Sequence, residues 1–389
     1  MKSRTRRWLL VGGAAGGVAL AAGGARRFLR DEHAPLGFTP DPDYLARANA
    51  LLDRVAAIDI HAHPGRTFFR DAEDLSLSVR IFSLRGTRES EAVDDMRAGK
   101  LAAASFAAVA DFQVLSFSKK AGLFAARPFA KGEAWSSYQR QIANLKALAE
   151  RLPLRPALEP DDILTARSES RIAALWTTEG ADYLEGDLSR LAVLHADGIR
   201  SVTIVHYRDS EVGDIQTGTA PHGGLTPFGA DVVREMARLG MVVDVAHASE
   251  ATALRAVDLA ERPVMCSHTH LQGDPIQHPR FISARLAQAI AERGGVIGAW
   301  PAGLGITTFE QFVDRVFTLV EKLGVDHVAL GTDMDANYKP VMDNYRQLPL
   351  LVSELLRRGM GEPAVTAFLS GNFMRVFAAV RAGREQVTA

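Results

Sequence analysis

Six short apolar runs each end on a histidine or an acidic residue, and this feature constrains the fold more than any other. The runs cover residues 57–63, 173–179, 202–206, 241–247, 263–268 and 327–333. Buried parallel strands are continuous apolar runs, and a barrel of such strands gathers the residues at their carboxyl ends around one pocket. Histidine and carboxylate side chains are ligands for divalent metals. The sequence therefore predicts strand ends that converge on a metal site.

Strands and helices alternate along the rest of the chain. We predict eight strands, near residues 58, 111, 174, 202, 242, 264, 296 and 328, and helices over 44–56, 135–152, 226–239 and 283–293. A further helix is expected to start at Ser249, and Gly240 is expected to stop the helix that opens at Thr226. Eight alternating units favour an α/β fold, a (β/α)8 TIM-like barrel, over an open sheet. The barrel domain is assigned to 43–389.

The segment after the first strand is too long for an ordinary loop. Residues 64–110 have mixed charge and no obvious strand, whereas loops between strands and helices are usually a few residues long. We therefore expect a long insertion that covers the mouth of the pocket.

The composition limits the kinds of molecule that this protein is expected to bind. The 389 residues carry 45 basic and 46 acidic side chains, a net charge of −1, so no global field attracts nucleic acid or an anionic membrane. A small or neutral partner is favoured. Cys266 is the only cysteine, which excludes an intrachain disulfide and a thiolate-rich metal site. Any metal here must bind to nitrogen and oxygen ligands.

The N-terminus reads as a separate segment over residues 1–30. Arg6-Arg7 precedes a Gly/Ala-rich apolar stretch from Leu9 to Ala25, which resembles a twin-arginine export signal. This predicts an exported protein, periplasmic or anchored on the outer side of the inner membrane. The apolar stretch is at the short limit for spanning a bilayer, so an uncleaved anchor and N-terminal membrane association stay open. Residues 31–42 are expected to form a linker.

Five of the strand-end residues form a candidate binuclear site. His61 and His63 are one residue apart, so on an extended strand both point to the same face. Glu179 ends an apolar strand, where an ionised carboxylate is costly unless it is paired or bound to a cation. Its two oxygens could bridge one ion held by His61 and His63 and another held by His247 and His268. Each histidine alone also fits a packed core position.

Asp333 would lie on the eighth strand, which a closed barrel brings beside the first. Its other interpretation is a cap for a helix after that strand. Both remain open from the sequence.

These residues belong to a series of ordered motifs. The motifs are 57–63, 178–180, 198–206, 224–229, 236–249, 267–268, 331–335 and 371–375. In these motifs the chain resembles the membrane dipeptidase group (renal dipeptidase, peptidase family M19) of the amidohydrolase superfamily, from about residue 57 to about residue 376.

The resemblance implies two zinc ions, with another divalent metal left open, and hydrolysis of a dipeptide or similar small amide by a metal-bridging hydroxide. Asp333 would act as general base and then general acid. His206 would bind substrate by a hydrogen bond to the developing oxyanion, and Arg280 would bind the substrate's free carboxylate. Zinc ligands would be His61, His63, Glu179, His247 and His268.

Three departures from the family pattern bear on specificity. His63 stands where the family usually has aspartate, Phe281 where it usually has asparagine, and the segment 64–110 has no clear counterpart. One alternative keeps the barrel and metals but changes the substrate to a lactone, a cyclic amide or an N-acyl amino acid. Another is an exported barrel that binds metal and peptides without cleaving them. Substrate side chain and stereochemistry, signal cleavage and oligomeric state, including a homodimer, stay open.

Overall fold

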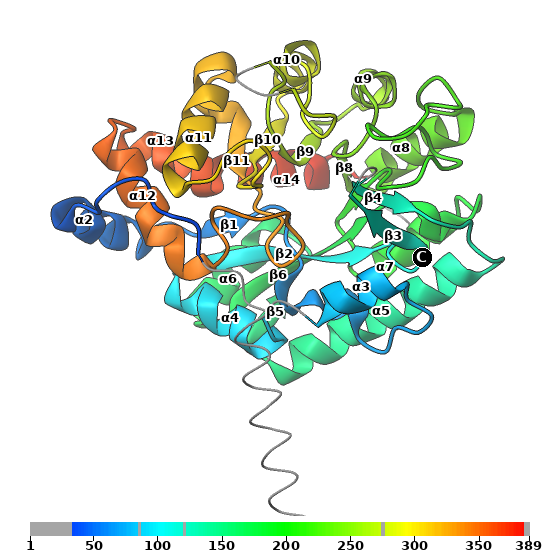
Figure 1. The fold of residues 1–389 in the computed structure, drawn as a ribbon, viewed down its shortest axis with the longest axis horizontal. Coiled ribbons are helices and arrows are strands. Elements are labelled where there is room, and N and C mark those ends of the chain that lie inside the picture. The colour runs from blue at the N-terminus through cyan, green and yellow to red at the C-terminus, as the bar shows by residue number, and fades with distance from the viewer. Residues whose placement is uncertain (1–32, 85–86, 120–121, 274–276, 385–389) are drawn as a thin grey trace, which may run out of the picture.

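The computed structural model describes residues 33–84, 87–119, 122–273 and 277–384 (Figure 1). The predicted export segment over 1–30 lies outside these ranges, as do the first two residues of the predicted linker. Within the described part of that linker, the backbone carbonyls of Pro35 and Leu36 accept hydrogen bonds from Phe309 and Glu310, at 2.9 and 2.8 Å. Residues just before the first helix are therefore attached to the barrel.

A barrel of eight parallel strands forms the centre of the described chain. In order of pairing the strands are β1 (Ala57–Asp59), β2 (Leu101–Val109), β6 (Ile172–Glu179), β7 (Ser201–Thr203), β8 (Val242–Asp244), β9 (Met265–Thr269), β10 (Val296–Ala299) and β11 (Val328–Leu330). The two ends meet, because Ile60 donates to the carbonyl of Leu330 at 2.9 Å and Asp333 donates to that of His61 at 2.8 Å. The predicted (β/α)8 barrel is confirmed.

The strand predicted near residue 111 is wrong, and β2 precedes it. All nine residues of β2 are buried, and it pairs with β6 from Ala103–Ala173 to Val109–Glu179. Five of these residues are alanines, which have low strand propensity, so burial between neighbouring strands and helices decided the structure here. The residues expected to form the strand instead turn away and enter a separate antiparallel hairpin, β3 (Leu115–Ser118) and β4 (Gly122–Ala125). A short extra strand, β5 (Leu154–Pro156), pairs with the start of β6.

The insertion after β1 is shorter than expected, because residues 64–110 include β2. What precedes β2 is a 3-10 turn, η1 (Pro64–Phe69), and the helices α3 (Leu77–Ser83) and α4 (Glu89–Ala98). Asp335, in the loop after β11, accepts hydrogen bonds from Gly65 N at 2.8 Å and Thr87 Oγ1 at 2.6 Å. These bonds attach the insertion to the carboxyl-terminal end of the barrel.

The expected helices are present with small shifts at their ends. They are α2 (Pro42–Leu52), α5 (Glu133–Arg151), α8 (Pro227–Leu239), α9 (Glu250–Leu259) and α10 (Ala284–Glu292). Thr226 and Ser249 cap the starts of α8 and α9, and Gly240 ends α8 in the left-handed region at φ +72°. The other helical elements are α6 (Pro160–Ser168), η2 (Asp182–Leu184), α7 (Arg190–Ala196), α11 (Phe309–Leu323), η3 (Val325–His327), η4 (Tyr345–Gln347), α12 (Leu348–Arg357), α13 (Glu362–Thr366), η5 (Ala367–Gly371) and α14 (Asn372–Ala382).

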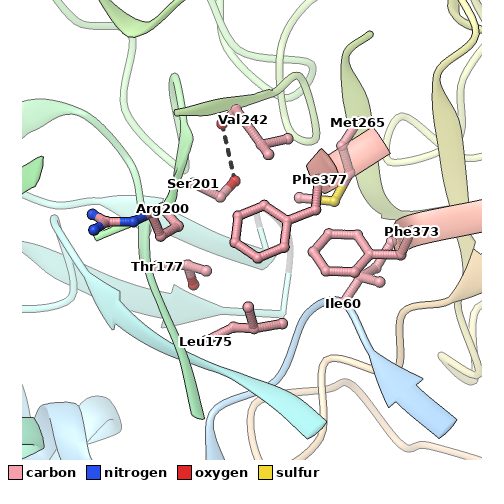
Figure 2. A pocket seen from close by; sticks show the side chains of 9 residues that line it. All are labelled: Ile60, Leu175, Thr177, Arg200, Ser201, Val242, Met265, Phe373 and Phe377. Atoms are coloured by element: carbon pink, nitrogen blue, oxygen red, sulfur yellow. Dashed lines mark hydrogen bonds between the residues drawn. The ribbon is translucent and has the colours of Figure 1, made fainter. Parts of the chain in front are cut away.

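Helix α14 closes the amino-terminal end of the barrel. Phe373 and Phe377 point into a cavity of only about 10 Å³, which Val242 and Met265, the first residues of β8 and β9, also line (Figure 2). The barrel interior is therefore a packed core, and open space for a ligand must be sought at the opposite end.

One helical stretch of the described residues, Glu362–Ala382, would be long and apolar enough to cross a membrane, judged by length and composition alone. Helices of a protein core pass the same test. Within this stretch Val376, Phe377 and Val380 are buried in the fold.

Candidate metal centre

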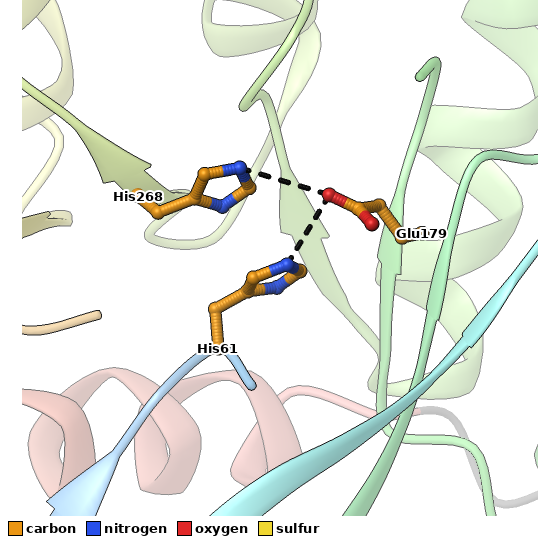
Figure 3. A group of neighbouring side chains, drawn as sticks. All are labelled: His61, Glu179 and His268. Atoms are coloured by element: carbon orange, nitrogen blue, oxygen red, sulfur yellow. Dashed lines mark ion pairs between the residues drawn. The ribbon is translucent and has the colours of Figure 1, made fainter. Parts of the chain in front are cut away.

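The five predicted ligands meet at the carboxyl-terminal end of the barrel. Glu179 is the last residue of β6, and its Oε1 lies 3.2, 3.0 and 3.6 Å from the Nε2 atoms of His61, His247 and His268. Its Oε2 lies 3.3 Å from Nε2 of His63. All five side chains are buried. Figure 3 shows His61 and His268 pointing at the same oxygen of Glu179, and their rings are stacked with centroids 4.1 Å apart.

Two buried aspartates hold the strand ends that carry these histidines. Asp59 accepts hydrogen bonds from the backbone of His61 at 3.2 Å and of Thr332 at 3.0 Å, and from the hydroxyl of Tyr345 at 2.8 Å. Burial raises the pKa of Asp59 to about 6, although these hydrogen bonds lower it. The bonds join β1 to the loop after β11.

Asp244 likewise holds together the ends of β7, β8 and β9. It accepts from Thr203 Oγ1 at 2.7 Å, Ala246 N at 3.0 Å and Ser267 N at 2.9 Å. Sequence reasoning assigned neither Asp59 nor Asp244 a role. Their position inside otherwise apolar strands could have indicated these roles, because a buried acid must find hydrogen-bond partners.

The backbone is strained next to the cluster. His247 and Asp333 have φ values of +64° and +55°, in the left-handed region that residues other than glycine rarely adopt. Such conformations persist where the surrounding structure imposes them, and they concentrate at functional sites.

Asp333 lies beside the first pair of histidines. Its Oδ1 is 3.4 Å from Nε2 of His63 and 3.9 Å from Nε2 of His61. The first helical element after β11 begins at Tyr345, so Asp333 does not cap a helix. Burial lowers the pKa of His63, but the adjacent carboxylates of Asp333 and Glu179 raise it to about 10. The cluster therefore attracts positive charge strongly.

His206 follows β7, and its ring faces Oε2 of Glu179. Its Nε2 lies 3.3 Å from Glu179 Oε2, and its Nδ1 lies 2.5 Å from Asp111 Oδ1. Burial lowers the pKa of His206, but the charges of Asp111 and Glu179 outweigh this and raise it. Sequence reasoning missed Asp111, because the misplaced second strand put it inside a strand.

Arg280 is buried against the second pair of histidines. Its Nη2 lies 2.8 Å from His247 Nε2 and 3.0 Å from His268 Nε2, and its Nη1 donates to Gln216 Oε1 at 2.7 Å. Burial, with the nearby positive charge of Arg280, holds the pKa of His247 well below its usual range. The pKa of His268 is lowered in the same direction, chiefly by burial. Both imidazoles are therefore kept neutral, as metal ligands must be.

The donor atoms fit metal ions. Three overlapping groups have ligand atoms within 4.8 Å of one another, namely His61/Glu179/His268, His61/His63/Asp333 and Glu179/His206/His247. The Nε2 atoms of His61 and His63 are buried without a hydrogen-bond partner, which is costly unless something else binds them. Nitrogen and carboxylate oxygen are also a donor set suited to zinc and related ions.

The fold and the cluster together define a class of protein. It is a (β/α)8 barrel with buried side chains that could hold metal ions at the carboxyl ends of its strands. The family model for membrane dipeptidase (peptidase family M19) matches residues 45–389. The chain belongs to this family.

Curated relatives are dipeptidases by name. The chain is 31% identical over 229 residues to dipeptidase tcpJ of Claviceps purpurea, covering 57% of this chain and 54% of that protein. It is 28% identical over 260 residues to dipeptidase verJ of Clonostachys rogersoniana, covering 64% and 67%. Dipeptidase 3 of Rattus norvegicus is 27% identical over 234 residues, covering 56% and 47%. The match to tcpJ and to the rat protein thus spans about half of their lengths.

Solved structures share the fold. The probable dipeptidase PvdM from Pseudomonas aeruginosa superposes with a TM-score of 0.71 at 18% identity, covering 88% of this chain and all (100%) of that one. A metallopeptidase from Rhodobacter sphaeroides, liganded with a phosphinate mimic of L-Ala-D-Ala, gives 0.70 at 19% identity, covering 84% and 99%. At such identities the likeness concerns the barrel architecture.

Proposed function

We propose that this protein is a metal-dependent dipeptidase that hydrolyses a dipeptide or a closely related small amide. One observation carries the proposal. The two oxygens of Glu179 lie within 3.6 Å of Nε2 atoms of four histidines that come from three other strand ends. A carboxylate so placed can bridge two cations. Membership of a metallopeptidase family supports the same reaction.

The ligands would be His61 and His63 for one ion and His247 and His268 for the other, with Glu179 between them. Zinc is the proposed metal, because imidazole suits zinc and His63 replaces a carboxylate that would suit harder ions. When bound, such ions supply Lewis acidity and lower the pKa of a bound water molecule.

The remaining residues have separate roles in this proposal. Asp333, beside His63, takes the proton of the attacking water and passes it to the leaving amine. His206 donates a hydrogen bond from Nε2 to the carbonyl oxygen as negative charge develops on it. Arg280 binds the free carboxylate of the substrate through its guanidinium.

Arg280 also favours one class of candidate substrate over another. A buried guanidinium needs an anionic partner, which a dipeptide or an N-acyl amino acid provides and a lactone or cyclic amide need not. Arg280 lies over the rings of Trp300 and Tyr207, with its central carbon 5.3 and 5.9 Å from the ring centres, and this packing holds the side chain in place. Dipeptides are therefore favoured over neutral cyclic substrates.

Export is proposed on sequence grounds, from Arg6-Arg7 and the apolar stretch after them.

Metal analysis followed by a substrate screen tests the function. We expect two metal ions per chain in the purified protein, and hydrolysis of L,L- or L,D-dipeptides by the same preparation. Glu179→Gln should lose metal and turnover together, while Glu354→Gln, the same change at a buried acid paired with Arg357 away from the site, should keep both. One metal ion or none would contradict the bridging role of Glu179. Metal with tight peptide binding and no cleavage would indicate a binding protein.

A further inference from the structure

A buried carboxylate behind His206 has no role in the function described so far. Asp111 is 0% exposed, and it uses both of its oxygens. Oδ1 lies 2.5 Å from His206 Nδ1, and Oδ2 accepts a hydrogen bond from the backbone of Tyr207 at 2.9 Å. One side chain thus holds both the ring of His206 and the backbone just after it.

The packing of three strand ends brings Asp111 to this place. Ala110 donates to the carbonyl of Glu179 at 2.8 Å, and Gly180 donates to that of Thr203 at 2.9 Å. Gly180 has φ +92°, and a Cβ there would lie 2.8 Å from the Cβ of Ala110 and 3.4 Å from that of His206. Because Gly180 has no side chain, the residues after β2, β6 and β7 can approach this closely.

The contact determines which edge of the imidazole faces the metal centre. An ionised carboxylate only accepts hydrogen bonds, so Nδ1 of His206 must carry a hydrogen and point at Asp111. The opposite edge then presents Nε2 to Glu179, at 3.3 Å. Without Asp111 the ring would lose the partner that distinguishes its two faces, and a half-turn about its last torsion would move Nε2 away from the cluster.

We propose that Asp111 is a positioning residue, which holds His206 in the one ring orientation that presents Nε2 to the carbonyl of the substrate. The inference rests on the proposed function, because His206 acts there on the developing oxyanion. Hydrogen bonds aimed in advance at that charge are effective because they need no reorganisation during the reaction.

A neighbouring acid provides a matched control. Asp182 is also buried, but it pairs with Arg208 at 2.9 Å and makes no hydrogen bond to His206. Asp182→Asn therefore removes a second acid near His206, one whose pKa is raised to about 7 by burial, and leaves the Asp111 contact unchanged. The comparison separates the hydrogen bond from the general field of the acids.

Kinetics of the metal-loaded enzyme are the main test. In Asp111→Asn the amide oxygen can still accept from Tyr207, so we expect a folded enzyme with normal metal content. Its kcat should fall roughly 10- to 100-fold, a loss of the size known for removal of the partner that orients a metal-ligating histidine. KM should change less than about threefold, because the interaction acts in the transition state. Asp182→Asn should stay within about threefold of wild type in kcat.

A double variant, in which Asp111→Asn is combined with His206→Ala, shows whether Asp111 acts through His206. In His206→Ala, adding Asp111→Asn should cost less than about twofold more, because residues that act as a unit are not additive. A full 10- to 100-fold further loss would overturn the inference, as would a kcat for Asp111→Asn within about threefold of wild type.

A spectroscopic measurement covers the case in which Asp111→Asn does not fold. Imidazole ¹⁵N spectra of metal-loaded wild type, with His206 assigned by its loss in His206→Ala, should show both Nδ1 and Nε2 protonated, because Nδ1 donates to Asp111 and Nε2 must donate to the oxyanion. An unprotonated Nδ1 would overturn the inference. A wild type without dipeptidase activity would instead overturn the proposed function, and with it the positioning role of Asp111 in that reaction.

Discussion

At the scale of single residues, the site depends on buried acids that are not predicted ligands. Asp59, Asp111 and Asp244 each connect groups from two or more strand ends. Each lies within the barrel where an unpaired carboxylate would be costly, so each is fully hydrogen-bonded. Their shared effect is to set the direction in which His61, His206, His247 and His268 leave the barrel.

The role of Arg280 gives a prediction at this scale. Arg280→Ala should raise KM for a free dipeptide roughly 10- to 100-fold, because a charge-assisted hydrogen bond is worth about 1.5–3 kcal/mol. The same dipeptide with an amidated carboxyl group should show little change in KM between wild type and variant. Steady-state kinetics with both substrates, after a check of metal content, make the comparison. An equal rise for both substrates would contradict carboxylate binding by Arg280.

At the scale of elements, local chemistry specified helix ends better than strands. Thr226 and Ser249 cap helices through their own side chains, and Gly240 ends α8 because it can adopt positive φ. These signals lie within a few residues of the boundary they set. The alanine-rich β2 carries no such signal, since it is a strand only because it lies between β1 and β6.

Close packing between strands gives the second prediction. A Cβ on Gly331, just after β11, would lie 1.8 Å from the backbone oxygen of Ser267 in β9, which cannot move freely. Gly331→Ala should destabilise the fold by about 3 kcal/mol, at the upper end of overpacking effects. Gly371→Ala is the control, because Gly371 is helical and its Cβ would meet nothing closer than 3.9 Å. That change should be neutral or stabilise by about 0.5–1 kcal/mol.

Urea unfolding of both variants measures these effects. A Gly331→Ala protein as stable as wild type would mean that β9 and β11 can separate at little cost. The m-value should be compared as well, because a change in it would indicate a different unfolded or native ensemble.

At the scale of the whole molecule, α14 connects parts of the barrel that are distant in sequence. Asn372 donates to the carbonyls of Val325 and Val328, at 2.7 and 2.8 Å. Arg381 donates to the carbonyl of Gly240 at 2.9 Å and lies 3.2 Å from His195 Nε2. Because the guanidinium is a donor, that ring nitrogen must accept, and the imidazole is neutral in the fold.

This contact predicts loss of stability in acid. Burial, together with Arg200, Arg381 and Arg384, lowers the pKa of His195 from 6.5 to about 4. Between these values the unfolded chain binds a proton that the folded chain does not, so the free energy of unfolding falls as pH falls from 6.5 toward 4. His195 is partly exposed, so the effect should be about 1–2 kcal/mol.

His195→Gln tests this prediction, because its amide oxygen can accept from Arg381 without titrating. Denaturant midpoints of wild type and variant, measured between neutral pH and pH near the lower pKa, should converge or cross as the pH falls. A difference in stability that is constant with pH would show that His195 does not titrate as described.

The chain alone specified the barrel and its expected metal ligands, because apolar strands that end on His61, His63, Glu179, His247 and His268 are patterns within short stretches of sequence. The tertiary structure alone decided where β2 lies, and that Asp111, Asp59 and Asp244 support the site. The reason is physical. An alanine run becomes a strand, and a buried acid becomes a support, only through partners that the fold brings from distant parts of the chain.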